Sequence, residues 1–347
     1  MKYGLIPTSL SEYFAIWAGK MPVPAIDVIF SLIKARSLMA GVSLGIFEVL
    51  KDVPLTPQEI AARCQLDAEC TEILLRTLVS IEYLEQSGNK YSLSDLSRRT
   101  LVVGAKDDLS GYIQWNYTQW EMIGHLEELI RTGKGIDFHQ TMDAPEKWAN
   151  YQQAMLEVAR FQAPVMASKV PVKPGARRLL DLAGSHGLIG ATICRLHPPM
   201  KSEVVDLPEA IEHARTLAHL EQIDDIVTHQ AGDILSDSYG DDYDVVLAAN
   251  ILHHFDEGAN LKILRRVHSS LNSNGTVAIW EIEAPDKTAK ANETDGAVLF
   301  FRLTSNARCY SGGDYTNWLK ETGFEEIKVK RPLLAPGFVL VTARREK

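Results

Sequence analysis

The sequence predicts an α/β protein, in which a doubly wound, mostly parallel sheet follows a mainly helical region. From residue 175 onward, short β-rich runs alternate with helical stretches, a pattern typical of a parallel sheet that binds ligands at the carboxyl ends of its strands. The first 105 residues have the order helix, turn, helix and hairpin, which is typical of a winged helix. With 347 residues, 46% hydrophobic and 23% charged, the chain has enough apolar material for two cores.

The first predicted domain covers residues 1–105. Apolar residues at helical spacing over residues 21–50 predict helices interrupted at Gly41 and Gly45. In LTPQEIAARC, Thr56 and Glu59 form a capping-box pattern and Pro57 suits the first helical position, so a helix should begin there. A second helix is predicted over residues 67–84. A short hairpin over residues 83–94 should follow, with its turn at residues 87–89.

The charge of this region argues against a nucleic-acid partner. Residues 1–110 contain 11 Lys and Arg against 13 Asp and Glu, and Arg76 is the only cation of the helix predicted over residues 67–84. Because phosphate neutralisation dominates nucleic-acid affinity, we expect no nucleic acid to bind. The apolar helices over residues 21–50 are better suited to a subunit interface.

Composition also limits the compartment and the ligands. The formal net charge is −9, and the four cysteines are scattered without a CxxC pair, which favours a reducing compartment. The chain begins without a charged head and apolar segment of the signal-peptide type, and no apolar run approaches the roughly 20 residues that span a membrane. We therefore expect a cytoplasmic protein that does not associate with membranes. Because no carboxylate or Cys/His set has metal-ligand spacing, no metal is predicted.

The remaining chain divides into an aromatic-rich helical connector over residues 106–170 and the sheet domain over residues 171–347. The β-rich runs that predict strands, including a terminal hairpin, lie at residues 177–183, 202–207, 224–230, 243–250, 275–283, 324–331 and 337–345. Helices are predicted over residues 188–197, 208–220 and 261–271.

Polar and small residues follow the first three of these strands. Gly184 and Gly187 form a turn that lets the backbone approach a ligand, although glycines also suit a tight strand-to-helix turn for steric reasons. Asp206 lies 25 residues after Asp181 and is placed to accept hydrogen bonds from a ribose diol. Asp233 ends the third strand. The alternatives are a helix start for Asp206 and a turn role for Asp233, and the succession of these features favours a nucleotide-like ligand.

In this order and spacing, DLAGSHG, VVDLPEAIEHA, AGDI and NILHHFDE resemble the S-adenosylmethionine-dependent small-molecule O-methyltransferases. The closest type is the plant caffeate-like and bacterial natural-product group. The resemblance covers nearly the whole chain and implies a Rossmann-like class I methyltransferase domain over residues 171–347. It also implies a homodimer formed through the winged-helix dimerisation domain, S-adenosylmethionine as cofactor and a small-molecule acceptor.

The resemblance also implies which residues bind the cofactor. The turn over residues 183–187 would hold the methionine part, Asp206 the ribose, and Asp233 with Ile234 the adenine, while Asn250 could donate to either ligand. The complete set is Asp181, Gly184, Ser185, Gly187, Asp206, Leu207, Asp233, Ile234 and Asn250. The family usually has three consecutive glycines where this chain has Ala183, Gly184 and Ser185.

In the family, a Leu-His-Asp motif supplies the general base. Aligned on Leu252, that base is His253, and His254 stands where the family usually has Asp. An imidazole with a pKa near 6.5 can take the proton of a phenol with a pKa near 10 as the hydroxyl attacks. We expect His254 to be structural, pinning the loop to a helix whose N-cap is Asp256.

Glu281 is the predicted orienting partner of His253, because it matches a glutamate that flanks the catalytic His in plant members. The alternative is a solvated strand end, since Glu283 alternates with Glu281. A second flanking glutamate would fall near Cys309, and its absence indicates a different arrangement around the base.

The family places its acceptor between the connector helices and the sheet, which here assigns Trp148, Met155 and Phe301 to substrate binding, as walls for a flat aromatic acceptor. An aromatic stripe on a helix is equally typical of a core or a dimer contact. Three other functions remain open: methyl transfer to carbon, nitrogen or sulfur, use of the cofactor without methyl transfer, and transcriptional regulation.

Overall fold

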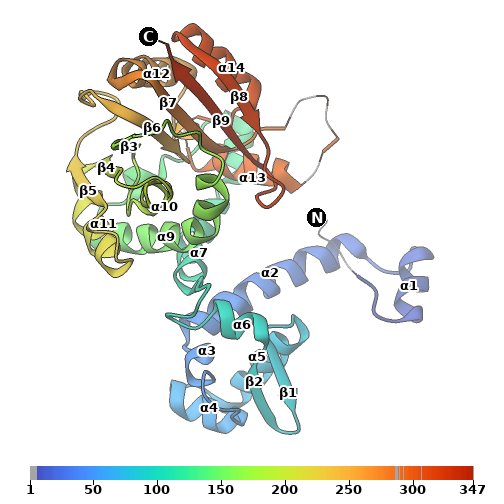
Figure 1. Cartoon of the computed structure of the whole chain (residues 1–347). Coiled ribbons are helices and arrows are strands. Elements are labelled where there is room, and N and C mark those ends of the chain that lie inside the picture. The colour runs from blue at the N-terminus through green and yellow to red at the C-terminus, as the bar shows by residue number, and fades with distance from the viewer. Residues whose placement is uncertain (1–5, 286–287, 289, 292, 306, 347) are drawn as a thin grey trace. The chain divides into compact units, whose positions relative to one another are not determined.

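The computed structural model describes residues 6–285, 288, 290–291, 293–305 and 307–346, which form two compact units, Met1–Tyr117 and Thr118–Lys347 (Figure 1). The division lies inside helix α7 (Ser110–Ile123), within the expected connector. The other connector helices, α8 (Leu126–Thr132) and α9 (Pro145–Ala167), belong to the second unit.

The first unit is mainly helical and contains the predicted hairpin. Thr56 caps α4 as expected: its Oγ1 accepts from the backbone N–H of Glu59 at 3.3 Å, and Glu59 accepts in return from the N–H of Thr56 at 2.8 Å. The hairpin pairs Ser87 with Lys90, so Gly88 and Asn89 form its turn. The elements of the first unit before α7 are α1 (Leu10–Trp17), α2 (Val23–Ser43), α3 (Ile46–Val49), α4 (Pro57–Cys64), α5 (Ala68–Ser80), β1 (Leu84–Ser87), β2 (Lys90–Leu93) and α6 (Asp95–Thr100).

The predicted helix interruption at Gly41 was wrong, because α2 continues through this residue. A Cβ atom at Gly41 would lie 2.8 Å from Cε2 of Phe47, so glycine here allows α3 to pack closely against α2. The interruption at Gly45 is confirmed: its φ of +73° is left-handed, and α2 has ended just before it. Glycine is therefore needed at position 41 for close packing of the two helices, and at position 45 for the reversal of the chain.

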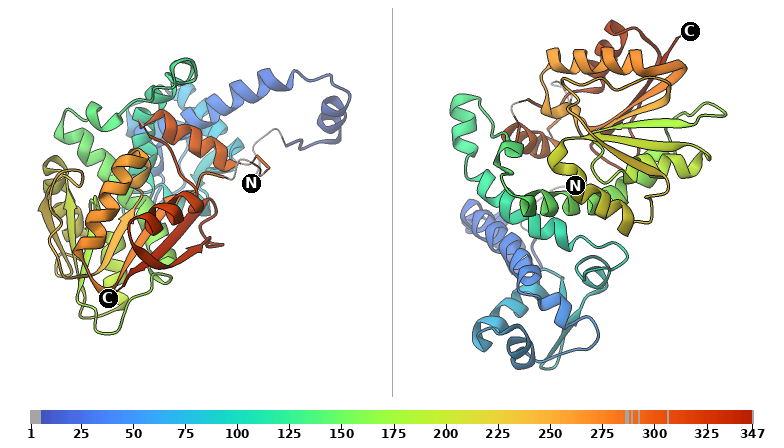
Figure 2. Two further views of the ribbon diagram at one scale, coloured as in Figure 1. Left: turned by 90° about the horizontal axis from the view of Figure 1, so that it is seen from above. Right: turned by 90° about the vertical axis from the view of Figure 1, so that its left-hand side faces the viewer.

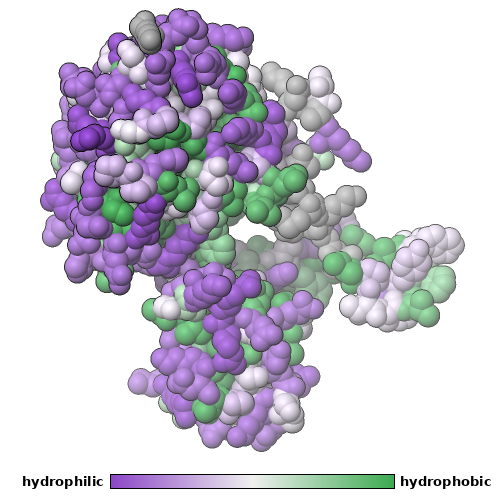
Figure 3. Space-filling view, in the orientation of Figure 1, coloured by the Kyte–Doolittle hydropathy of each residue, from purple (hydrophilic) through white to green (hydrophobic). Residues whose placement is uncertain are grey.

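Apolar side chains are exposed along α1 and the first half of α2 (Figure 3). No residue of α1 is buried, and Trp17 is 76% exposed. Exposed apolar surface of this kind is typical of an interface with another chain. The exposed large residues of the two helices are Leu10, Tyr13, Phe14, Trp17, Val28, Ile29, Phe30, Leu32 and Ile33.

The second unit contains a seven-stranded sheet in the order β5-β4-β3-β6-β7-β9-β8. The pairs among β3 to β7 are parallel, and β9 pairs antiparallel with β7 and β8, so the predicted doubly wound sheet and terminal hairpin are confirmed. The strands are β3 (Arg178–Leu182), β4 (Lys201–Asp206), β5 (Val227–Ala231), β6 (Tyr243–Ala249), β7 (Leu271–Ile282), β8 (Phe324–Lys330) and β9 (Phe338–Arg345). The remaining helices are η1 (Phe138–Thr141), α10 (Leu188–Leu196), α11 (Pro208–Leu220), η2 (Leu252–His254), α12 (Glu257–Ser270), α13 (Glu293–Leu303) and α14 (Gly312–Glu321).

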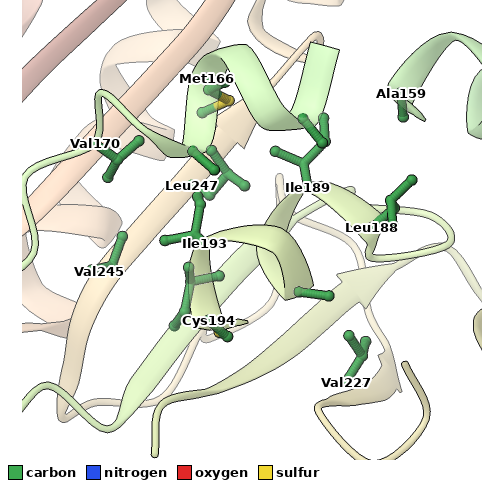
Figure 4. Packing of buried hydrophobic residues seen from close by; sticks show 14 of the residues in the cluster. Ala159, Met166, Val170, Leu188, Ile189, Ile193, Cys194, Val227, Val245 and Leu247 are labelled. Atoms are coloured by element: carbon green, nitrogen blue, oxygen red, sulfur yellow. The ribbon is translucent and has the colours of Figure 1, made fainter. Parts of the chain in front are cut away.

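Helices cover both faces of this sheet, as the right-hand view of Figure 2 shows. Alternate strand residues enter two hydrophobic clusters, since successive side chains of a strand point to opposite faces. Leu247 packs with α9 and α10, where Figure 4 shows it near Met166 and Ile193, whereas Val246 packs with α12 and α14. Near-continuous apolar runs in the central strands follow from burial on both faces.

The strand order reverses between β3 and β6, because the chain passes from β3 outward to β4 and β5 and then returns to β6. In doubly wound sheets, ligands bind outside the carboxyl ends of the strands at this point. Within the part of the chain that the structure describes, no helix is long and apolar enough to cross a membrane.

Candidate functional site

The turn between β3 and α10 has an unusual backbone. Ala183 and Ser185 have φ angles of +51° and +47°, a left-handed conformation that costs a residue with a Cβ atom about 1–2 kcal/mol. Gly187, also left-handed, leaves no room for a side chain, because a Cβ atom would lie 2.7 Å from Cγ1 of Val227. At Gly184 a Cβ atom would lie 2.4 Å from the carboxyl carbon of Asp181. The turn thus packs its backbone directly against the sheet and the Asp181 carboxyl.

Three side chains, from β4, β5 and the turn itself, form hydrogen bonds that fix the backbone of this turn. Asp206, at the end of β4, accepts from the backbone N–H of Ser185 at 2.9 Å. His229 of β5 donates from Nε2 to the carbonyl of Ser185 at 3.0 Å. His186 accepts from the N–H of Leu188 at 3.1 Å through Nδ1, so its other nitrogen donates to the carbonyl of Met155 on α9. Both imidazoles are neutral, since burial lowers their pKa, to about 3 for His186.

Two carboxyl groups lie buried at the base of the turn. Burial raises the pKa of Asp181 to about 7, although a hydrogen bond from the backbone of Gly190 acts in the opposite direction. Burial likewise raises the pKa of Asp206 to about 6, against backbone hydrogen bonds from Leu207 and Ser185. Oδ1 of Asp181 and Oγ of Ser185 are buried and have no hydrogen-bond partner in the described part of the chain.

These groups fit S-adenosylmethionine. The cofactor offers an ammonium group and a ribose diol as hydrogen-bond donors, and the turn presents carboxylate oxygens and an unpartnered hydroxyl. The glycine positions let the backbone itself approach a ligand. The acceptor-rich site suits a cation, in agreement with the acidic balance of the chain.

The other residues expected to bind the cofactor lie at the same edge of the sheet. Leu207 is 37% exposed at the start of α11. The carboxylate of Asp233 accepts from the N–H of Leu235 at 2.8 Å and from Oγ of Ser236 at 3.1 Å, within its own turn. Ile234 is buried in the cluster on the α12 face of the sheet.

Asn250 lies just beyond β6, where its φ is +55°. Its Nδ2 donates to Oε1 of Gln162 at 3.1 Å, and Nε1 of Trp280 donates to the same oxygen at 3.2 Å. Gln162 thus ties α9 to the ends of β6 and β7.

His253 and Glu281 form a buried pair. Nδ1 of His253 lies 2.6 Å from Oε2 of Glu281, whose other oxygen accepts from the N–H groups of Ile251 at 2.8 Å and Leu252 at 2.7 Å. Glu281 is therefore not a solvated strand end, whereas the side chain of Glu283 is 14% exposed and pairs with the exposed Arg331 at 2.6 Å. Nε2 of His253 is buried and, among the described residues, has no hydrogen-bond partner. Glu281 fixes the ring so that Nε2 is the nitrogen left for a ligand.

Aromatic rings from the connector and from α13 surround His253. The Phe301 ring lies edge-to-face against it, with centroids 4.6 Å apart, and the His254 ring lies 4.2 Å away. His254 in turn contacts the rings of Phe138 and His139. Asp256 caps α12 as predicted, by accepting from the N–H of Ala259 at 2.8 Å. The His254 ring, which we expected to pin the loop to this helix, lies among the aromatic rings instead.

Two of the three predicted substrate residues lie in this group of rings. Trp148 stacks on His139 with centroids 6.0 Å apart and donates from Nε1 to the carbonyl of Met142 at 3.1 Å. Phe301 contacts the proposed base directly. Met155 lies further along α9, where its carbonyl receives the His186 hydrogen bond.

Sequence reasoning missed the roles of His139, His186, His229 and Gln162. His186 lies within the DLAGSHG motif, but its bond to α9 is not evident from that motif; the other three belong to no motif, and His139 is separated from His254 by more than one hundred residues. Single polar residues of this kind become informative only when the fold brings them together. Among the described residues, no group of three or more His, Cys, Asp or Glu side chains is arranged to hold a metal ion.

Comparisons with known proteins agree with this geometry. Residues 124–325 match the O-methyltransferase domain, and residues 26–103 match the O-methyltransferase dimerisation domain. The 3-hydroxy-5-methyl-1-naphthoate 3-O-methyltransferase of Streptomyces sahachiroi is 28% identical over 91% of this chain and 93% of its own length. The N,N-dimethyltransferase OxyT of Streptomyces rimosus is 24% identical, with 86% and 89% covered.

Among solved structures, human N-acetylserotonin methyltransferase in complex with SAM superposes with a TM-score of 0.85. Its sequence is 20% identical, and the match covers 99% of this chain and 100% of that one.

Proposed function

The chain belongs to the family of S-adenosylmethionine-dependent O-methyltransferases, which act on small molecules, and on that premise we propose that His253 deprotonates a phenolic hydroxyl of a flat aromatic acceptor. The observation that carries this proposal is the His253–Glu281 pair. Glu281 engages Nδ1 at 2.6 Å, and Nε2 is left buried and unpartnered.

The chemistry divides between the cofactor and the chain. When bound, S-adenosylmethionine supplies a methyl group activated by the sulfonium. His253 takes the hydroxyl proton on Nε2, and the fully buried carboxylate of Glu281 stabilises the imidazolium that forms. The N–H groups of Ile251 and Leu252 hold that carboxylate in place. Such a base typically contributes about 10²–10⁴ in rate, and alignment of the acceptor contributes further.

In the proposed cofactor site, the turn over residues 183–187 with Asp181 holds the methionine part. Asp206 and Leu207 hold the ribose, Asp233 and Ile234 flank the adenine, and Asn250 lies between cofactor and acceptor. The unpartnered oxygens of Asp181 and Ser185 support this assignment.

The proposed acceptor site is formed by Trp148, Met155 and Phe301. The edge-to-face contact of Phe301 with His253 supports a flat aromatic acceptor, whose ring could lie against these walls. The naphthoate substrate named for the Streptomyces sahachiroi relative supports the same class.

We further propose three functional regions: dimerisation over residues 1–105, a connector over residues 106–170 and the catalytic domain over residues 171–347. The exposed apolar residues of α1 and α2, together with the match to the dimerisation domain, support a homodimer.

The test separates cofactor binding from chemistry. Calorimetry should give micromolar binding of S-adenosylmethionine to the wild type and to His253→Ala, and none to Asp206→Ala. With 2-naphthol and other phenols as probes, His253→Ala should lower kcat by about 10²–10⁴. Unchanged turnover in His253→Ala would refute the base, and NMR of the product would show whether the methyl group is on the oxygen or on a ring carbon.

A further inference from the structure

One buried amide on α12 connects the two ends of the loop that carries His253. We call residues 251–255, which include η2, the His253 loop. Asn260 is fully buried and donates from Nδ2 to the carbonyl of Leu252 at 3.0 Å and to that of Phe255 at 3.1 Å. An NH₂ group has two protons, so each carbonyl receives one of them. Because these carbonyls lie on either side of His253, a single group spans the turn that bears the imidazole.

Stability alone does not account for an amide at this position. The carbonyl of Leu252 also accepts from the N–H of Phe255 at 3.2 Å, and the carbonyl of Phe255 also accepts from the hydroxyl of Tyr310 at 2.8 Å. Both carbonyls would therefore keep a partner without Asn260. Its own Oδ1 is buried and has no partner among the described residues, which is unfavourable. The benefit of the amide thus lies in the geometry of the loop that it spans.

The opposite side of the His253 loop is fixed by Glu281. Its Oε1 accepts from the N–H groups of Ile251 and Leu252, and its Oε2 lies 2.6 Å from Nδ1 of His253. The loop is therefore attached to β7 through N–H groups and a ring nitrogen, and to α12 through carbonyls. If the attachment to α12 is released, the part of the loop after Leu252 can move away from Glu281, and the bond at Nδ1 weakens.

From this geometry we propose that Asn260 is a positioning residue for methyl transfer, because its bridge between two carbonyls holds the His253 ring where Nδ1 bonds to Glu281 and Nε2 is left for the acceptor. Asn260 acts through the backbone of the loop and takes no part in the chemistry itself. A misplacement of about 1 Å in a catalytic group can lower a rate about 10²-fold. The inference rests on the proposed function for the role of Nε2, so one of its two measurements does not depend on turnover.

The first measurement observes the ring by NMR. In protein labelled with ¹⁵N-histidine, the Nδ1 proton held by Glu281 should give a signal at low field that exchanges slowly with solvent, and His253→Ala identifies this signal by removing it. Asn260→Leu keeps a branched side chain without a donor, and Asn260→Ala cannot overpack the site. In both variants the signal should be lost or broadened by exchange. A role in stability alone would leave the signal unchanged in the folded protein.

The second measurement separates kcat from binding. With 2-naphthol as the probe, both Asn260 variants should lower kcat about 10–100-fold, while their calorimetric affinity for S-adenosylmethionine stays within about 2-fold of the wild type. Tyr310→Phe removes the other bond to the carbonyl of Phe255 but leaves the bridge intact, so it should lower kcat less. Ser270→Ala is the matched control: this buried hydroxyl in the same helix donates to the carbonyl of Val267 at 3.0 Å, and its loss should change neither the signal nor kcat. Urea denaturation shows whether each variant is folded.

A low-field signal that persists in both Asn260 variants would overturn the inference, and so would its absence from the wild type. Equal losses of kcat in the Asn260 variants and in Ser270→Ala would also overturn it, because the effect would then come from the stability of α12. If the signal depends on Asn260 but turnover does not depend on His253, the proposed base is wrong and the positioning of the ring stands. If turnover requires His253 but kcat survives in both Asn260 variants, the base stands and the positioning role is wrong.

Discussion

The turn after β3 and the rings around His253 lie in the same unit and are built on opposite principles. In the turn, side chains satisfy the backbone: Asp206 accepts from the N–H of Ser185, His229 donates to its carbonyl, and His186 donates to the carbonyl of Met155. Only Oδ1 of Asp181 and Oγ of Ser185 are left there without a partner among the described residues. Around His253, Nε2 of this ring is buried without a partner among the described residues, and the ring of His254 contacts those of His253 and His139 without a hydrogen bond to either. A turn whose backbone is fixed by side chains is preorganised for one invariant cofactor. Unpaired donors and acceptors instead reject molecules that cannot complete them, which gives specificity.

The largest effect is expected for a variant that disrupts the proposed catalytic pair and leaves the turn after β3 unchanged. In Glu281→Gln, the amide oxygen can still accept from the N–H groups of Ile251 and Leu252, but the amide NH₂ faces Nδ1 of His253. The imidazole must then carry its proton on Nε2 and cannot act as a base, so kcat should fall by about 10²–10⁴ with little change in stability.

Glu281→Ala provides the contrast for this variant, because it leaves both buried N–H groups unpaired. We expect it to lose activity and also roughly 2–6 kcal/mol of unfolding free energy. Methyl transfer and urea denaturation measure the two effects, and full activity in Glu281→Gln would contradict the orienting role.

The second prediction concerns the electrostatics of the turn. Because the pKa of Asp181 is about 7 in the folded chain and 3.8 as a free side chain, the unfolded state loses this proton first as pH rises. The contribution of Asp181 to stability is therefore fully present below about pH 4 and is lost as pH rises toward 7, by roughly 4 kcal/mol.

Asp181→Asn removes this titration. Without cofactor, the variant should gain a few kcal/mol relative to the wild type at pH 8 and nothing at pH 4, as measured by chemical denaturation at both values. A stability difference that is the same at both pH values would show that the carboxyl is not held neutral.

A third, smaller effect tests the close packing of the turn. A Cβ atom at Gly190 would lie 2.5 Å from Oγ of Ser202 and 2.9 Å from Oδ2 of Asp181, so Gly190→Ala should cost about 1–3 kcal/mol and weaken cofactor binding. Gly296→Ala is the control, because Gly296 lies within α13 with nothing inside 4 Å of its Cβ position. That variant should gain roughly 0.5–1 kcal/mol. Equal midpoints of thermal unfolding for the two variants would contradict the packing argument.

The smallest effect concerns the departure from the glycine-rich pattern. Ala183→Gly should relieve about 1–2 kcal/mol of left-handed strain, against about 0.4–1 kcal/mol of added freedom in the unfolded chain. We therefore expect a net gain of roughly 1 kcal/mol or less in denaturant unfolding, with cofactor affinity unchanged. A loss of stability would mean that the alanine methyl contributes packing that outweighs the strain.

The sequence predicted what depends on local pattern and failed where the outcome depends on packing. The capping box at Thr56, the strands and the hairpin turn at Gly88 follow from short-range chemistry, and all three are confirmed. The purpose of Gly41 could not be predicted, because it depends on where the ring of Phe47 lies.

In the candidate site, strand alternation places Glu281 and Glu283 on the same side of the chain and could not say which of them would be buried. Only the register of the sheet and the loop that it supports decide that. The ring contact between His139 and His254 was not predicted, since nothing near His139 in the sequence points to position 254. This feature depends on a contact between segments that are distant in the sequence, and no local sequence pattern contains it.

Helix α9 carries parts of both regions in one rigid rod. Trp148 and Tyr151 near its start belong to the ring cluster, the Met155 carbonyl receives His186 from the turn, and Gln162 holds Asn250. Because α9 is continuous from Trp148 to Gln162, a displacement of the turn would be passed along the helix to the acceptor walls. We therefore expect the enzyme to bind its substrates in order, the cofactor before the acceptor, with α9 coupling the two binding events.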